Sequence, residues 1–425
     1  MMILYHLLST VLAFLIAPVF LVFSLATNSK RRGLVHHFGL VPAPECATDK
    51  KTLWLFALSL GEVTAAAPVL KIIHEKNPGL RLVVSVTTDS GYDGAWQKIP
   101  FADQIIFHPF DCLPFTLIAL NRIRPDCFVV TDTGFWPGLL DLLTRRNTPK
   151  LLFNGRLSKR SRTRYQRLGN FPKNLFNRFQ TLGTKSEDEK TAFKSLGVDA
   201  SRLQVIGDPK FDALVKVQDD ERKNIRAQLG IVDENLVWVA GSTHKGEEEI
   251  VLGVYQNLTR KFTDLVLILA PRRLERISAL EALLRSRNIS FTRRTAITKA
   301  SNPQVILLDT MGELDKLYSI ANVAFVGNSL LPPGGGHSLM EPLVQGVPVA
   351  HGPHVENFQQ MAAELQQKEL AFQVTGADEM TTVLTSLLEK PDNATVFTDQ
   401  ASTWINSRKG ASRRMAELIL EVLKD

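Results

Sequence analysis

Residues 328–358 read NSLLPPGGGHSLMEPLVQGVPVAHGPHVENF, and they are the most informative stretch of the chain. Three consecutive glycines, 334–336, stand between an apolar run at 323–326 and a helical pattern expected to begin at about Ser338. Glycines let a backbone approach a ligand closely, and a helix start offers unpaired N–H groups and a positive dipole end, which suit a phosphate. Glu341, one turn into that helix, is placed to accept hydrogen bonds from ribose hydroxyls. The stretch predicts a nucleotide or phosphate site of the kind found in two-domain α/β proteins.

The same residues have a purely structural interpretation. Ser338 and Glu341 fit a capping box, in which the two side chains satisfy the backbone N–H groups at a helix start without any ligand. Glycines before a helix are also common in α/β folds. The small loop at 351–354, His-Gly-Pro-His, follows the next apolar run and adds weight to the site.

Length and composition describe a globular protein with more than one core. The chain has 425 residues, of which 44% are hydrophobic and 22% charged, and two domains are the better expectation. Cys46, Cys112 and Cys127 are odd in number and are not paired at metal-binding spacing, so neither a disulfide framework nor a zinc site is expected. The net charge of +7 favours an anionic partner such as a membrane surface, a phosphate-bearing lipid or a nucleotide.

The amino-terminal segment, residues 1–29, is expected to be a membrane anchor because it contains no Asp, Glu, Lys or Arg. Residues 3–26 are apolar and long enough to cross a bilayer, and the basic start of a cleaved signal peptide is missing. Lys30, Arg31 and Arg32 follow directly, which places the rest of the chain in the cytoplasm. A hydrophobic helix that lies in the interface and grips one leaflet is the alternative.

Alternation of apolar runs with helical patterns predicts parallel sheets covered by helices on both faces. A first set of expected strands lies at 53–58, 82–87, 127–131, 150–153 and 181–184, and a second at 237–240, 265–269, 304–308, 323–326 and 347–350. One helix is expected over 403–424. The fold class is therefore α/β, with two Rossmann-like domains at 30–215 and 216–425 and a cleft that collects loops from both.

Glu62 is the candidate general base. It follows the first expected strand of the soluble part, where side chains face a ligand-binding edge. A base for a sugar hydroxyl needs a raised pKa, whereas a helix start lowers the pKa of a carboxylate, so burial would have to win. The alternative is a glutamate that only complements the helix dipole.

Other loops offer contacts to an anionic ligand. Ser242 lies in a glycine-bounded loop at 241–246, and Arg272 follows the next expected strand, where it could pair with a phosphate or remain an ordinary surface arginine. The turn at 309–314 has a glycine and polar residues able to wrap a base edge. Basic residues crowd one segment of the amino-terminal half, as a solvated face or as a patch for anionic lipid; they include Arg156, Lys159 and Arg160.

Taken together, these motifs closely resemble the 3-deoxy-D-manno-octulosonic acid (Kdo) transferases, the lipid A glycosyltransferases of Gram-negative bacteria. The resemblance covers nearly the whole chain and rests on the segments 59–62, 135–137, 154–158, 210–212, 242–248, 271–272, 309–314, 335–337, 341, 352–354 and 357–358. It implies a GT-B fold, a CMP-Kdo donor held mainly by the carboxy-terminal domain, and a lipid A precursor as acceptor.

The resemblance also implies roles for single residues. Glu62 matches the catalytic base of the family, and Lys210 and Ser242 match positions near the donor. Positions assigned to CMP recognition match Arg272, Met311, Gly312, Glu313, Gly335, Gly336 and Glu341, with Ser338 where the family carries Asn after Gly-Gly-His.

One departure bears on activity. Gly134 stands where the family carries the second acid of a Glu-Thr-Glu motif, so acceptor handling or catalytic competence differs from the family pattern.

The prediction from the sequence is an inverting Kdo transferase of the inner membrane, with its catalytic domains on the cytoplasmic face. It needs no metal or other cofactor; its partners are CMP-Kdo, a lipid A precursor and inner-membrane lipid, and not nucleic acid. Two alternatives stay open: a GT-B transferase that uses another nucleotide sugar, and a catalytically inert nucleotide- or lipid-binding homologue.

Overall fold

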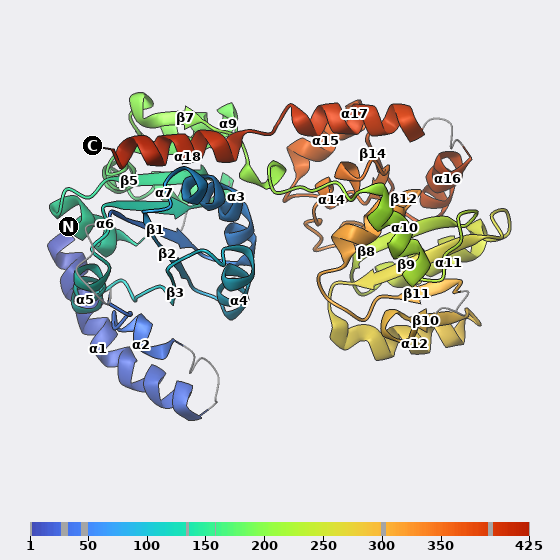
Figure 1. Cartoon of the computed structure of the whole chain (residues 1–425), viewed down its shortest axis with the longest axis horizontal. Helices are drawn as coiled ribbons and strands as arrows, with labels where there is room; N and C mark the ends of the chain where they lie inside the picture. Colours follow the sequence, from blue (N-terminus) through green and yellow to red (C-terminus); the bar gives the residue numbers. More distant parts are fainter. Residues whose placement is uncertain are drawn as a thin grey trace. The chain divides into compact units, whose positions relative to one another are not determined.

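The computed structural model describes residues 2–26, 33–43, 50–132, 136–157, 159–298, 303–389 and 394–424. The chain forms two compact units, one built from Met1–Ala213 with Arg408–Asp425 and the other from Leu214–Ser407 (Figure 1). Each unit contains a seven-stranded parallel sheet with helices on its faces, which confirms the predicted α/β fold class. Gly134 and the basic residues 30–32 lie outside the described residues.

The sheet of the first unit has the strand order β3-β2-β1-β4-β5-β6-β7. Its strands are β1 (Thr52–Ala57), β2 (Arg81–Val86), β3 (Gln104–Phe107), β4 (Cys127–Thr131), β5 (Lys150–Gly155), β6 (Thr181–Thr184) and β7 (Leu203–Val205). The helices between them are α3 (Leu60–Lys76), α4 (Asp89–Lys98), α5 (Leu113–Ile123), α6 (Pro137–Arg145), α7 (Lys159–Gln166), α8 (Phe171–Phe176) and α9 (Glu187–Lys194). The five strands predicted for this unit correspond to β1, β2, β4, β5 and β6 within about two residues, and β4 and β6 match residue for residue; the two edge strands, β3 and β7, were not predicted.

Alternation along β1 explains why helices cover both faces of this sheet. Leu53 and Leu55 belong to one buried cluster, which includes residues of α3 and α18 (Ala411–Val422). Trp54 and Phe56 point to the opposite face and belong to a second buried cluster, with residues of α5 and α6. A strand buried on both faces needs a continuous apolar run, which is what the sequence supplies.

The carboxy-terminal residues correct the sequence-based prediction. The single helix expected at 403–424 is two helices, α17 (Ala394–Asn406) and α18, separated at Gly410, which has φ 94°. The carboxylate of Asp212 accepts the backbone N–H groups of Gly410 and Ser412, both at 2.6 Å, and so fixes the start of α18. Helix α18 packs on α3, so Arg408–Asp425 belong to the first unit and not to the expected second domain 216–425.

The sheet of the second unit has the strand order β10-β11-β9-β8-β12-β13-β14. Its strands are β8 (Leu236–Thr243), β9 (Leu265–Pro271), β10 (Phe291–Arg293), β11 (Val305–Leu307), β12 (Val323–Val326), β13 (Val349–His351) and β14 (Ala371–Gln373). The main helices are α10 (Asp219–Gln228), α11 (Glu247–Leu258), α12 (Ile277–Ser286), α13 (Leu314–Leu317), α14 (Met340–Val344), α15 (Gln359–Gln367) and α16 (Ala377–Leu388).

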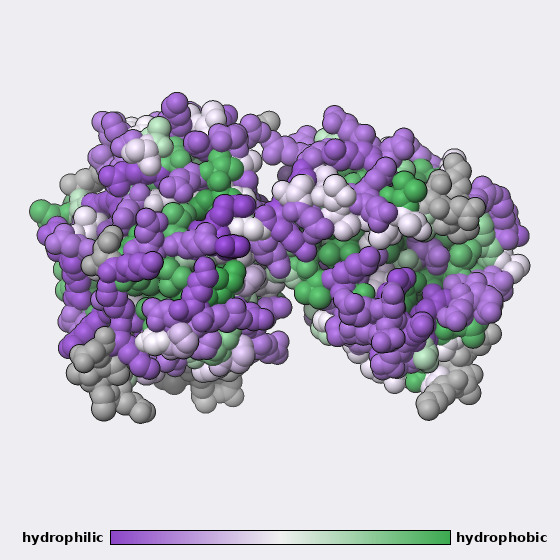
Figure 2. All heavy atoms as spheres, turned by 45° about the horizontal axis from the view of Figure 1, so that its top comes forward, coloured by the Kyte–Doolittle hydropathy of each residue, from purple (hydrophilic) through white to green (hydrophobic). Residues whose placement is uncertain are grey.

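The amino-terminal helix α1 (Met2–Ala26) and the short α2 (Leu34–His37) precede the first sheet. The window Met2–Val19 of α1 has a mean hydropathy of 2.1, so by length and composition this helix could cross a membrane. Elsewhere the surface is mostly hydrophilic in the view of Figure 2.

Candidate functional site

Both sheets reverse their strand order at one point, and the candidate residues follow the strands at that point. In the first unit the reversal lies between β1 and β4, and the chain continues from them to Glu62 and Asp132. In the second unit it lies between β8 and β12; Ser242 lies at the carboxyl end of β8, and the loop after β12 contains the three glycines 334–336. Open parallel sheets bind ligands outside the carboxyl ends of strands at such switch points. Each unit therefore has its own candidate site.

Glu62 lies in the first turn of α3, and its carboxylate turns back toward the end of β1. Its Oε2 atom accepts the backbone N–H of Leu58 at 2.5 Å, and the hydroxyl of Thr131, the last residue of β4, donates to the same oxygen at 3.5 Å. The residue before α3, Ser59, makes no side-chain capping bond. The carboxylate is therefore fixed at the switch point by groups from both strands.

Burial raises the pKa of Glu62 to about 7. The Leu58 N–H and Thr131 hydroxyl lower the pKa, as does the nearby Lys210, while the negative charge of Asp132 raises it. From the sequence, the helix start would lower the pKa of Glu62 and burial would raise it. In the structure the effect of burial is the larger of the two. A carboxylate with a pKa near neutrality has the property that a general base for a hydroxyl needs.

Cations lie beside this carboxylate in the first unit. Lys210, in the single turn Pro209–Phe211, packs against α3, and burial together with the charge of Lys185 lowers its pKa. Lys185 forms an ion pair with Asp208 at 3.0 Å, and Arg156 is close enough to influence the pKa of Lys210. The structure therefore places Lys210 beside Glu62, in a different unit from Ser242 and the other residues predicted to contact the donor.

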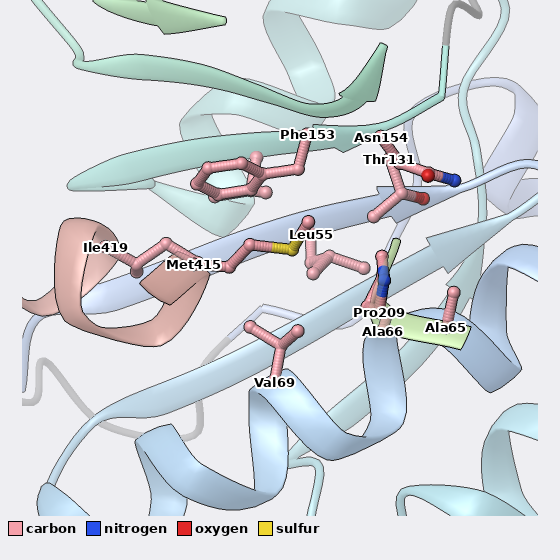
Figure 3. Close-up of a pocket in the computed structure, with 11 residues that line it drawn as sticks. Leu55, Ala65, Ala66, Val69, Thr131, Phe153, Asn154, Pro209, Met415 and Ile419 are labelled. Carbon is pink, nitrogen blue, oxygen red and sulfur yellow. The ribbon is translucent and has the colours of Figure 1, made fainter. Parts of the chain in front are cut away.

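Behind Glu62 the first unit has a small cavity of about 10 Å³, enclosed by α3, α18 and the ends of three strands (Figure 3). Met415 of α18 points toward Leu55 and Phe153 in this space, and Thr131 and Asn154 lie at its polar end. A cavity of this size holds roughly one water molecule. It is a packing gap beneath α3 and is too small for a sugar or a nucleotide.

The glycine loop of the second unit corrects one expectation. The N–H of Gly335 donates to the carbonyl of His354 at 3.1 Å, and the N–H of Gly336 donates to the carbonyl of Asn328 at 2.7 Å. These two N–H groups are therefore used within the protein and are not available to a phosphate. All three glycines have positive φ, and a Cβ on Gly334 would lie 2.2 Å from the Cβ of His354, so the glycines are needed for the loop itself.

The predicted helix start at Ser338 is also wrong. Helix α14 begins at Met340, its capping residue is Leu339, and no side chain caps it. Ser338 and Glu341 therefore do not form a capping box, and a helix of five residues provides little dipole. Pro342 lies in the first turn, where its missing N–H costs nothing.

A buried carboxylate holds this loop in place. Glu247, the first residue of α11, is 1% exposed. Its Oε2 atom accepts the N–H groups of His244 and Asn328, both at 2.8 Å, and its Oε1 atom accepts those of Ser329 and Leu330, both at 2.9 Å. One side chain thereby ties the loop after β8 to the loop after β12.

Polar side chains from different loops lie close together near Glu247. Nε2 of His244 lies 3.3 Å from Nε2 of His337. Burial lowers the pKa of His337 to about 4, with a further contribution from Arg272, so the imidazole is neutral at pH 7. Burial raises the pKa of Glu341 to about 7, with Asp315 raising it further and Arg272 lowering it. Arg272 is exposed, and its charge acts on both His337 and Glu341.

The turn after β11 also belongs to the candidate site of the second unit. Glu313 accepts a hydrogen bond from Thr310 and pairs with Arg294 at 3.0 Å, which fixes the turn. Gly312 has φ 84°, and Met311 is 63% exposed. An exposed methionine on a fixed turn provides an apolar contact for a planar base.

Arg156, Lys159 and Arg160, the residues predicted to bind the acceptor, lie at the end of β5 and the start of α7. Arg156 is exposed and joins the charges around Lys210; the side chains of Lys159 and Arg160 lie outside the described residues.

Three residues of these candidate sites were not predicted from the sequence. They are Lys185, Glu247 and His337, and His337 contacts His244. Lys185 directly follows β6, so the rule that polar residues after parallel strands face the ligand edge could have found it. Glu247 is indistinguishable in sequence from its neighbours Glu248 and Glu249, and its role depends on contacts with residues more than eighty positions away.

Comparisons with known proteins agree with the resemblance. The family model described as "3-Deoxy-D-manno-octulosonic-acid transferase (kdotransferase)" matches residues 30–213. A 3-deoxy-D-manno-octulosonic acid transferase of Haemophilus influenzae is 29% identical over 400 residues, which cover 93% of this chain and 92% of that protein. A bifunctional glycosyltransferase/methyltransferase of Fusobacterium nucleatum is 34% identical over 342 residues, which cover 78% of this chain but 52% of that protein; the match thus spans about half the relative's length.

Solved structures share the fold. The UDP-GlcNAc 2-epimerase of Neisseria meningitidis bound to UDP-GlcNAc superposes with a TM-score of 0.59 at 17% identity, over 88% of this chain and 99% of that one. A glycosyltransferase of Rickettsia africae gives a TM-score of 0.58 at 12% identity, over 89% of this chain and 100% of that one. At these identities the likeness describes the fold alone.

Proposed function

Because residues 30–213 belong to the Kdo transferase family and the protein is a glycosyltransferase, we propose that it moves Kdo from CMP-Kdo to a lipid A precursor. The observation that carries the proposal is Glu62, a fixed carboxylate at a switch point with its pKa raised to about 7. We place this reaction at the cytoplasmic face of the inner membrane, where the apolar helix α1 would hold the protein.

In the proposed reaction Glu62 acts as the general base. The carboxylate takes the proton of the acceptor hydroxyl while that oxygen attacks the anomeric carbon of Kdo. The bond from the anomeric carbon to the phosphate oxygen breaks in the same step, and CMP leaves with the electron pair. A single displacement of this kind inverts the anomeric configuration. General-base assistance is worth about 10²–10⁴ in rate.

The second unit would hold the cytidylate. The structure uses the Gly335 and Gly336 N–H groups internally, so the proposal assigns the phosphate to side chains. Arg272 would donate to phosphate oxygens as negative charge grows on the leaving group, together with the one N–H that the neutral pair of His244 and His337 does not use internally. Glu341 would accept from ribose hydroxyls, and the turn with Met311 would contact the base.

The cations of the first unit suit an anionic acceptor. Lys210 lies near Glu62, and Lys185 and Arg156 lie near Lys210, so phosphate groups of a lipid A precursor would be held on the side of the base where these cations lie. No metal is assigned to the reaction, so transfer is expected to continue in the presence of a chelator.

The test is mass spectrometry of a lipid A precursor incubated with the purified protein and freshly generated CMP-Kdo, with and without EDTA. The expected product has the mass of the precursor plus Kdo. A panel with UDP-sugars serves as the matched comparison. Transfer from a UDP-sugar but not from CMP-Kdo would overturn the donor, and CMP binding without any product would favour an inert homologue.

A further inference from the structure

Helix α1 has two different faces. Its buried or half-buried residues recur at helical spacing and form an inner stripe of Met2, Tyr5, His6, Ser9, Thr10, Ala13 and Ala17. Its outer face consists of Ile3, Leu4, Leu7, Leu8, Val11, Leu12, Phe14, Leu15, Ile16, Val19 and Val22, each 52–79% exposed. Among the described side chains of α1, every polar one lies on the inner stripe.

This arrangement is the reverse of a surface helix in water, which turns its polar side outward. The inner stripe contacts the first unit, since α1 packs against α5 and α6 (Figure 1). The outer face is apolar and continuous over the described length of the helix. The environment that stabilises such a face is lipid hydrocarbon.

Tyr5 attaches the helix to the unit at one point. Its hydroxyl donates to Oδ2 of Asp111 at 2.6 Å. The carboxylate of Asp111 also accepts the N–H groups of Gly138 and Leu139, at 2.9 and 2.7 Å, which belong to the first turn of α6. Asp111 therefore joins α1 to the loop before α5 and to the start of α6.

His6 provides a second attachment and is only 8% exposed. Its Nε2 atom lies 3.1 Å from Oδ2 of Asp141, on α6, which also pairs with Arg145 at 2.9 Å and Arg178 at 2.8 Å. Burial alone would raise the pKa of Asp141, but the hydrogen bonds from Arg178, His6 and Arg145 lower it to about 2. A charged carboxylate therefore anchors this end of α1.

These contacts are incompatible with a helix that crosses the bilayer. Its 25 residues span about 37 Å and the hydrocarbon core is about 30 Å thick, so length permits crossing. Tyr5 and His6, however, lie at the amino-terminal end, which crossing would carry to the far side of the membrane. Their partners Asp111 and Asp141 belong to the folded unit that follows on the near side.

We propose that α1 lies in the plane of the membrane and buries its outer face in one leaflet, while Tyr5 and His6 hold its inner stripe on the first unit. The amino terminus then stays on the same side of the bilayer as both units. Val35 and Leu40, 52% and 44% exposed, extend the apolar surface beyond α1. Lys30–Arg32, next in the sequence, suit anionic head groups. The inference rests on the contacts of α1 and does not depend on which sugar is transferred.

Depth measurements along the outer face test the proposal. Four variants of the full chain are made, each with Cys46→Ser and with one new cysteine in place of Leu4, Leu8, Leu15 or Val22. The new cysteine carries a spin label, and the labelled protein is bound to vesicles of phosphatidylethanolamine and phosphatidylglycerol. Cys112 and Cys127 are buried, and the parent protein measures their background labelling. Equal, shallow depths at all four positions are expected. A profile that is deepest at position 15 and shallow at both ends would show a crossing helix, and labels that stay in water would exclude lipid; either result overturns the proposal.

A second experiment tests the attachment. The double substitution Tyr5→Phe with His6→Leu removes both polar contacts and leaves the helix apolar. The label at position 15 should then move deeper, because the polar contacts to Asp111 and Asp141 no longer hold the helix against the unit. Ser9→Ala is the matched control, since the Ser9 hydroxyl donates to the His6 carbonyl of the same helix at 3.3 Å. An unchanged depth in the double variant would refute the role of Tyr5 and His6. Neither experiment measures sugar transfer, so failure of this proposal can be distinguished from failure of the proposed function.

Discussion

The carboxylate of Glu247 accepts the backbone N–H of Asn328 at 2.8 Å, so one buried side chain connects the loops that follow β8 and β12. With the three further N–H groups it accepts, Glu247 determines where His244 and the glycine loop lie. Glu247 therefore holds the loops of the candidate site in the second unit in position, although it need not touch the ligand.

Glu247→Gln should weaken CMP binding at least about 10-fold and lower the melting temperature. An amide has one accepting oxygen in place of two, so buried N–H groups lose partners at a cost of about 1–3 kcal/mol each. Calorimetric titration with CMP and thermal unfolding measure the two effects. Glu249→Gln, an exposed position in the same first turn of α11, is the control and should change neither. Equal behaviour of the two variants would contradict the organising role.

Glu62→Gln should reduce transfer about 10²–10⁴-fold and leave CMP affinity unchanged, because the amide cannot accept a proton and Glu62 lies in the other unit from the proposed CMP site. The measurement is the initial rate of Kdo addition at saturating donor. Glu75→Gln, exposed near the end of the same helix, controls for a general effect on α3. Near-normal turnover of the Glu62 variant would reject the base.

The rate at saturating donor should rise with pH through about 7, since the base must be ionised and burial raises the pKa of Glu62 to about that value. Glu341 also has a pKa raised to about 7, so its ionisation is expected to affect donor affinity, which saturation removes from the measurement. The residual rate of Glu62→Gln should show no such rise. A rate that falls between pH 6 and 8 would exclude a base with this pKa.

The raised pKa of Glu62 also predicts how the stability of the folded state depends on pH. The rate should rise with pH, whereas the stability contributed by Glu62 should fall. A carboxyl group whose pKa is raised from 4.5 to about 7 stabilises the folded state below pH 4.5, and this contribution is lost as pH rises through 7. Gln at position 62 stays neutral at every pH. Its melting temperature relative to the wild type should therefore increase from pH 5 to pH 8, as thermal unfolding in matched buffers would show; a constant difference would mean that the pKa is not raised.

Gly327→Ala should destabilise the second unit by about 1–3 kcal/mol and impair CMP binding. A Cβ there would lie 2.6 Å from the carbonyl oxygen of Ser242, 2.7 Å from Cα of Thr243 and 2.8 Å from Oε2 of Glu247. Gly376→Ala is the control, because nothing lies within 4 Å of its Cβ and its backbone is extended. Chemical denaturation of both variants gives the comparison, and equal stabilities would argue against close packing of the two loops.

The sequence predicted the strands well because strands buried on both faces require continuous apolar runs. β12 was predicted residue for residue, and β8 and β9 were predicted short by a few residues, mainly at their carboxyl ends. The four edge strands β3, β7, β10 and β14 were not predicted. The helix start at Ser338 was predicted wrongly, because the glycine loop makes hydrogen bonds to His354 and Asn328 that no local pattern reveals. The carboxy-terminal helix was predicted as one element because helical periodicity does not show which unit a helix packs on.

Most candidate residues were named from the sequence, some because polar residues after parallel strands face the ligand edge and others because of the family resemblance; Lys185, Glu247 and His337 were not. Their roles remain predictions, but their environments came from the structure. Burial at the end of β1 sets the pKa of Glu62, and the pairing of His244 with His337 joins residues ninety-three positions apart.

By itself, the sequence determined the α/β fold, the resemblance to a known family and the apolar character of the first helix, because these follow from patterns carried within short segments. Tertiary structure alone decided that Arg408–Asp425 return to the first unit, that Glu247 organises the glycine loop, and that α1 turns Tyr5 and His6 inward. The physical reason is the same in each case: a side chain's partner and its burial depend on residues brought together only when the chain folds.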